Sequence, residues 1–359
     1  MEMPKIYVNP PRSEWPALTA RCTRQEEEIG ERVAAILAEV RTGGDAALRR
    51  IVRRIEGYLP ETFEVTRERR AEAAKAVSPQ LKAALEQAKA NIEAFHRAQL
   101  PAQVEVETMP GVRCVQRAVA IGRAGLYIPG GKAPLFSTVL MLALPARIAG
   151  CREVILCTPC GRDGRIAPEI LYAADLCGVD RVFALGGAQA VAAMAYGTES
   201  IPRVDKIFGP GNRYVTKAKQ LAGAADVAVD LPAGPSEVLV LADEDARPEF
   251  AAADLLSQAE HGGDSQAVLV CPSVEFARDT QRAVGEQLLQ LRRGETIREA
   301  LRQSRIVVLD SREKMIGFAN AYAPEHLIIS MRDAWDVAAQ ITAAGSVFIG
   351  PWSPESAGD

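Results

Sequence analysis

Polar and apolar positions in the first hundred residues follow a helical pattern. We predict four helices, at residues 23–41, at 43–58, from 66 onward and at 78–100. Thr66 and Ser78 are suitable N-cap residues, and Pro79 follows Ser78 at the first helical position. The helices are rich in Arg and Glu, so we expect them to expose much of their surface to solvent.

The pattern changes after Pro101. Residues 104–109 and 114–119 resemble two strands, with Pro110 and Gly111 as a hairpin turn. Strands and helices then alternate. The predicted strands are 125–128, 153–157, 181–184, 205–208, 227–230, 238–242, 267–271, 306–309, 327–330 and 346–349. The predicted helices are 134–148, 167–177, 188–196, 212–221, 248–261, 274–293, 312–321 and 333–343.

This alternation predicts an α/β fold in which helices cover both faces of parallel sheets. We expect three regions. Residues 1–124 form a helical N-terminal segment plus the hairpin, 125–235 a first α/β domain and 236–359 a second α/β domain. We expect the N-terminal segment to pack on the second α/β layer.

Composition narrows the class of protein. The chain has 359 residues, 48% of them hydrophobic, with a net charge of −4. An acidic balance gives no support for binding to nucleic acid or anionic membranes. No apolar run approaches the roughly 18 residues of a membrane span, and the N-terminus resembles no signal peptide. Seven scattered cysteines suit a reducing compartment, so we expect a cytoplasmic protein.

Three loops that follow predicted strands are rich in Gly and Pro. They hold Tyr127, Gln189 and Asn212, and two of them open helices. Small residues let a ligand approach the backbone, and helix N-termini attract phosphate. The chain lacks the G-x-G-x-x-G fingerprint, because Tyr214 stands where the third Gly would be. From the residues alone, nucleotide binding and ordinary tight turns both remain open.

Two pairs of residues could carry chemistry. Gln258 and His261 are at i and i+3 near a predicted helix end, where they could share a metal ion, or where His261 could interact with the negative helix end. Glu325 and His326 directly precede a strand, where they could divide acid–base work or form an ordinary loop pair. The Cys157-x-x-Cys160 motif has no second pair nearby, which favours a structural role.

Taken together, the loop sequences resemble the histidinol dehydrogenase family over nearly the whole chain. The matching segments are GLYIPGG (125–131), STVLM (137–141), ALGGAQA (184–190), FGPGN (208–212), PAGPSE (232–237), LSQAEHG (256–262), APEHL (323–327) and PESAGD (354–359). The resemblance implies two Rossmann-like parallel-sheet layers, as in aldehyde dehydrogenases. It also implies oxidation of L-histidinol to L-histidine through the aldehyde, in two NAD⁺-dependent steps that end histidine biosynthesis.

The resemblance also implies roles for individual residues. Zn²⁺ would be held by Gln258, His261 and Asp359. The substrate contacts would be Ser236, Gln258, His261, Glu325, His326 and Asp359. The NAD⁺ contacts would be Tyr127, Gln189 and Asn212. His326 would accept protons and Glu325 would activate water, while zinc would orient the substrate.

Members of the family form homodimers with swapped C-terminal segments. Those chains continue for several dozen residues beyond the motif that ends here at Asp359, and the segment carries a further His ligand. We therefore expect the 359-residue chain alone to bind zinc weakly and to turn over little substrate. The alternatives are a truncated non-catalytic subunit, or a relative that acts on another amino alcohol or a sulfonate.

Overall fold

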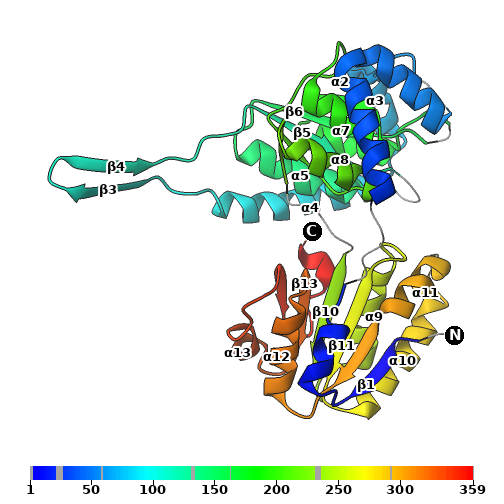
Figure 1. The fold of residues 1–359 in the computed structure, drawn as a ribbon, viewed down its shortest axis with the longest axis vertical. Helices are drawn as coiled ribbons and strands as arrows, with labels where there is room; N and C mark the ends of the chain where they lie inside the picture. The colour runs from blue at the N-terminus through cyan, green and yellow to red at the C-terminus, as the bar shows by residue number, and fades with distance from the viewer. Residues whose placement is uncertain are drawn as a thin grey trace. The chain divides into compact units, whose positions relative to one another are not determined.

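A computed structural model describes residues 3–21, 27–57, 60–130, 134–161, 163–230, 236–291 and 293–358, without the side chains of 27 and 28. The chain divides into two compact units (Figure 1). We call residues 25–233 the first unit and residues 1–24 with 234–359 the second unit. Both are α/β, which confirms the predicted fold class.

The first unit is built on a six-stranded sheet. Its order is β2 (Glu64–Val65), β7 (Arg181–Ala184), β6 (Glu153–Thr158), β5 (Arg123–Tyr127), β8 (Lys206–Phe208) and β9 (Ala228–Val229). All neighbours pair in parallel except β2, which is antiparallel to β7. The alternation of predicted strands and helices therefore indicated the correct sheet type, but it did not predict the two-residue edge strand β2.

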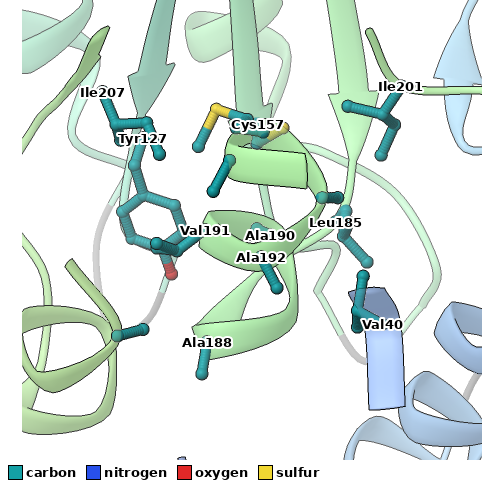
Figure 2. Packing of buried hydrophobic residues seen from close by; sticks show 14 of the residues in the cluster. Val40, Tyr127, Cys157, Leu185, Ala188, Ala190, Val191, Ala192, Ile201 and Ile207 are labelled. Carbon is teal, nitrogen blue, oxygen red and sulfur yellow. The ribbon is translucent and has the colours of Figure 1, made fainter. Parts of the chain in front are cut away.

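Helices cover both faces of this sheet. They are α2 (Glu27–Glu56), α3 (Arg67–Lys75), α4 (Pro79–Ala98), α5 (Phe136–Ile148), α6 (Pro168–Leu176), α7 (Gly187–Tyr196) and α8 (Arg213–Gly223). Helix α7 is buried on all sides up to Ala195, and Figure 2 shows Val40, Tyr127 and Leu185 around it. The predicted break near Gly43 is a kink at Gly44, whose φ of 49° an L side chain adopts only with strain.

The expected docking of the N-terminal helices differs from the observed one. Helix α2 packs on α7 and α8, α3 on α6, and α4 on α5, so all three belong to the first unit and not to the second layer. The physical reason is the apolar stripe of α2, in which Val33, Leu37 and Val40 are buried in the same core as α7. Only residues 3–21 of the described N-terminal segment join the second unit.

The second unit holds an all-parallel sheet. Its order is β1 (Lys5–Val8), β12 (Arg305–Val308), β11 (Gln266–Cys271), β10 (Glu237–Ala242), β13 (His326–Ser330) and β14 (Ser346–Ile349). Every residue of β10 and β11 is buried, as expected for central strands of a parallel sheet.

Two helical layers cover the second sheet. On one face lie α9 (Pro248–Ala259), α10 (Val274–Leu288) and α11 (Gly294–Gln303). On the other lie α1 (Trp15–Leu18), α12 (Arg312–Tyr322) and α13 (Ala334–Ala338). The short 3-10 segments η1 (Arg12–Glu14) and η2 (Glu355–Gly358) complete the unit. Among the predicted helices, 274–293 ends earlier, at Leu288, and α11 was not predicted.

The predicted hairpin is present as β3 (Val104–Met109) and β4 (Val112–Gln116), which extend away from the rest of the first unit (Figure 1). All eleven of its strand residues are exposed. Among the described residues, no helix is long and apolar enough to cross a membrane.

Candidate active site

The adjacent pair Glu325 and His326 lies at the amino end of the second sheet. His326 is the first residue of β13, opposite Val238 of β10 and Ser346 of β14. Glu325 lies in the preceding loop, and its Oε2 accepts a 3.4 Å hydrogen bond from the backbone N–H of Glu237. One member of the pair is thus in the loop and the other begins the strand, so the two side chains need not point to opposite faces of a sheet.

The loop before this pair has a fixed conformation. Helix α12 ends at Tyr322, and Ala323 adopts the left-handed conformation with φ 50°. The Arg21 guanidinium donates to the carbonyl oxygens of Tyr322 at 2.6 Å and Ala323 at 3.0 Å. It also stacks over the Tyr322 ring, 3.9 Å from its centroid. A non-Gly residue rarely adopts the left-handed conformation. Here it leaves the carbonyl oxygens of Tyr322 and Ala323 without helical partners, and Arg21 donates hydrogen bonds to both.

The imidazole of His326 faces a carboxylate. Its Nδ1 is shielded from solvent and has no hydrogen-bond partner in the described part of the chain. It lies 3.4 Å from Oε1 of Glu355 in η2, and the ring centroid lies 6.2 Å from that of Phe348. No local sequence pattern distinguishes Glu355, although it belongs to the PESAGD segment.

Gln258 lies in the last turn of α9 and His261 just after it, at the same edge of the sheet. Helix α9 returns from the carboxyl end of β10 to the amino end of β11, so its last turn lies near the amino ends of the strands. Gln258 is completely buried, and neither atom of its amide has a hydrogen-bond partner among the described residues. His261 is exposed, and its backbone N–H donates to the Gln258 carbonyl at 3.2 Å.

A buried amide without partners is costly, so the Gln258 side chain is suited to a ligand that the chain itself does not supply. The amide oxygen of Gln258 and an imidazole nitrogen of His261 can both coordinate zinc. Across the described ranges, no three His, Cys, Asp or Glu side chains form a metal-binding group. Asp359, the third expected ligand, lies outside the described residues.

The remaining substrate candidate, Ser236, directly precedes β10, and its carbonyl accepts from Gln266 N at 3.2 Å. One turn before Gln258 on α9 lies Asp254, a second residue that no local sequence pattern distinguishes. Burial raises the pKa of Asp254 to about 7, and the nearby negative charge of Glu355 adds to the shift. The second unit therefore gathers Ser236, Gln258, His261, Glu325 and His326 at one edge.

The three cofactor candidates lie at the carboxyl ends of strands in the first unit, the usual ligand edge of a parallel sheet. Tyr127 ends β5, and its hydroxyl accepts a 3.0 Å bond from Gly187 N at the start of α7. Burial raises the pKa of Tyr127 to about 12. Gln189 is buried in α7 and donates to Oε1 of Glu56 at 3.0 Å. Asn212 caps α8 by accepting from Tyr214 N and Val215 N.

The two thiols of the C-x-x-C motif are protonated. Burial raises the pKa of Cys160 to about 11 and that of the fully buried Cys157 further. Neither takes part in a disulfide. The thiolate is the reactive form of Cys, so these two protonated thiols are unreactive and the motif contributes to packing.

Comparisons with known proteins agree on one family. Residues 19–359 match the sequence profile described as histidinol dehydrogenase. The chain is 53% identical to the histidinol dehydrogenase of Bacteroides fragilis (strain YCH46), over 99% of this chain and 83% of that protein. It is 56% identical to the Xylella fastidiosa (strain 9a5c) enzyme, over 92% of this chain and 77% of that protein. The crystal structure of histidinol dehydrogenase from Elizabethkingia anophelis matches with a TM-score of 0.97 and 46% identity, covering all of this chain and 83% of that one.

Proposed function

The chain belongs to the histidinol dehydrogenase family, and on that premise we propose that it oxidises L-histidinol to L-histidine through the aldehyde, using two NAD⁺. The observation that carries the proposal is the gathering of Glu325, His326 and the buried, unbonded Gln258 at one edge of the second sheet. This edge therefore offers both acid–base groups and side-chain atoms that can coordinate a metal.

Zinc is the proposed metal, and Gln258 and His261 would hold it together with Asp359. When bound, zinc would hold the substrate through its imidazole and amino nitrogens, and NAD⁺ would accept one hydride in each oxidation. Support for zinc comes from the amide of Gln258, whose oxygen is buried without a donor among the described residues. Ser236 is the further proposed substrate contact.

His326 is the proposed base in both oxidations. In the first, it takes the proton of the alcohol O–H as the carbon loses hydride, which leaves the aldehyde. In the second, the hydrated aldehyde loses hydride from carbon to NAD⁺ and a proton from oxygen to His326, which has by then given up the first proton, and the carboxylic acid results. An imidazole is suited to this task because its pKa in water lies near neutrality.

Glu325 is the proposed activator of water between the two oxidations. Its carboxylate accepts a proton as the water oxygen adds to the aldehyde carbon. The protonated His326 gives its proton to the former carbonyl oxygen, which completes the hydrate and leaves His326 able to accept a proton again. The exposed position of Glu325 is compatible with access by water, and the Glu237 N–H holds one carboxylate oxygen. Only the second oxidation needs this step.

Tyr127, Gln189 and Asn212 are the proposed NAD⁺ contacts, and a homodimer in the cytoplasm is the proposed assembly and location. The exposed Val104, Val106 and Val115 of the hairpin support association with another chain. Because the Gly187 N–H is already bonded to Tyr127, the start of α7 offers one fewer phosphate donor than a usual dinucleotide site.

The test is NADH production by the purified protein from L-histidinol, with and without added zinc after chelation. Whatever the rate, the histidinol that is oxidised should yield two NADH per histidine formed, and the oxidation should depend on zinc. Failure to oxidise histidinol, combined with oxidation of another amino alcohol or a sulfonate, would assign the chain to a different activity within the family.

A further inference from the structure

The geometry points to Glu355 as a positioning residue that holds the His326 imidazole with Nδ1 toward its carboxylate and Nε2 free for the substrate. The inference rests on the proposed function of His326 as a base. It assigns to Glu355 a role through His326, without contact to the reacting atoms.

The first observation is the environment of Nδ1. This atom is shielded from solvent and bonded to no described residue, while Glu355 Oε1 lies 3.4 Å away. A buried ring nitrogen without a partner costs free energy. A carboxylate that accepts from Nδ1–H removes that cost. At 3.4 Å the contact is longer than a formed hydrogen bond of this kind, and such catalytic contacts tighten when substrate binds.

The second observation is that Glu355 is fixed from its other side. Its side chain is only 12% exposed, and the Ser257 hydroxyl donates to its Oε2 at 3.5 Å. The segment before it also contacts α9, where the largely exposed Trp352 ring lies edge-on to Phe250 at 5.0 Å between centroids. In Figure 1 this last turn of the chain lies beside β13 of the same unit.

Through these contacts Glu355 would influence catalysis by selecting the tautomer of His326. In a neutral imidazole one nitrogen carries the proton and the other accepts, and the bond made by one nitrogen decides the state of the other. A carboxylate at Nδ1 favours the Nδ1–H tautomer, which leaves the lone pair on Nε2. A base that must accept a proton in two successive oxidations needs that tautomer each time.

A different role for Glu355 would be purely structural, as the group that fastens η2 to α9 through Ser257. The tautomer of His326 separates the two roles. If Glu355 only fastens η2, its removal lowers the melting temperature but leaves the ring proton where it was.

Nuclear magnetic resonance of the ¹⁵N-labelled protein can read that tautomer, since the chain has only three histidines, His96, His261 and His326. The His326→Asn variant identifies the His326 signals. At a pH where the ring is neutral, we expect the proton on Nδ1 in the wild type and on Nε2 in Glu355→Ala, with Glu355→Asp closer to the wild type. A proton on Nε2 in the wild type, or no change in Glu355→Ala, would overturn the inference, whether or not the protein oxidises histidinol.

Kinetics provide the second measurement. We expect Glu355→Ala to lower kcat about 10–100-fold, less than loss of the base itself, with KM for histidinol nearly unchanged. Glu355→Asp should recover part of the loss. The control Glu313→Gln removes the same charge from the exposed surface of α12 and should leave kcat unchanged. Ser257→Ala, which loosens the anchor but keeps the carboxylate, should cost much less than Glu355→Ala, and equal losses would contradict the inference.

Discussion

The guanidinium of Arg21 donates a 2.6 Å hydrogen bond to the backbone carbonyl of Tyr322, which lies 301 residues further along the chain. The same group donates to Glu237 at 2.7 Å, and Glu237 in turn donates its backbone N–H to Glu325. A residue near the N-terminus therefore fixes both the loop before the proposed catalytic pair and the strand beside it.

From this relationship we predict that Arg21→Met lowers the free energy of unfolding by about 2 kcal/mol, because it removes charged hydrogen bonds and leaves the carboxylate of Glu237 buried without its cation. Urea unfolding measures the effect. The double variant Arg21→Met with Glu237→Gln should lose less than the sum of the two single variants. Strict additivity would mean that the two residues do not act together.

The acid–base pair gives a second prediction. His326→Asn should lower kcat about 10²–10⁴-fold, as for removal of a positioned base, with little change in substrate binding. Glu325→Gln should harm oxidation of the aldehyde more than oxidation of the alcohol, because only the aldehyde step consumes water. Rates with histidinol and with the aldehyde supplied separately measure the split. Equal losses in both steps would assign Glu325 another role.

Replacing Gln258 should change the melting temperature in different ways in the metal-free protein and in the presence of zinc. Leu has nearly the same size as Gln but no polar atoms, so Gln258→Leu should raise the melting temperature of the metal-free protein. Zinc should raise the melting temperature of the wild type by binding the folded state, and this increase should disappear in Gln258→Leu. The control Gln290→Leu, in the exposed turn that follows α10, should keep the zinc effect. A zinc effect retained by Gln258→Leu would exclude Gln258 as a ligand.

Most of the strands and helices of the two units followed from the sequence, because long buried strands such as β10 and β11 alternate with segments of helical pattern. The docking of the N-terminal helices did not follow. The amphipathic pattern of α2 shows that Val33 and Val40 need an apolar partner, but it does not show which of two similar layers supplies it. Strand β1 was missed for a related reason, since four residues at a sheet edge with exposed ends carry little periodic signal.

For the candidate site, the sequence motifs predict the residues that could act, but they do not predict the partners of those residues. Glu355 meets His326 only because η2 folds back on α9, and Arg21 meets Tyr322 only because residues 3–21 join the second unit. Contacts between residues so far apart in sequence depend on tertiary packing, and no local pattern records them. The raised pKa of Asp254 likewise depends on burial and on Glu355.

That pKa leads to a fourth prediction. Asp254 has a pKa of about 7 in the folded chain against 3.8 in the unfolded one, so the folded state binds its proton more tightly. Its contribution to stability therefore decreases as pH rises from about 4 to about 7. In chelator-treated protein, Asp254→Asn should melt a few degrees above the wild type at pH 8, and the gap should narrow at pH 5. The control Asp336→Asn, at an exposed position, should show no such dependence.

The last prediction separates two roles of Asn212. Its Oδ1 caps α8 by accepting from Tyr214 N at 3.0 Å and Val215 N at 3.2 Å, so a contact with NAD⁺ would use the amide nitrogen. Asn212→Ala loses both groups and should destabilise the protein by about 1 kcal/mol, whereas Asn212→Asp keeps a good cap and should not.

Both variants should weaken NAD⁺ binding, and Asn212→Asp should do so without a change in melting temperature, because it replaces the amide donor by a negative charge near the dinucleotide. Calorimetry in the presence of histidinol measures the affinity, and we expect much weaker binding when histidinol is omitted. Normal NAD⁺ affinity in Asn212→Asp would show that Asn212 serves only as the cap of α8.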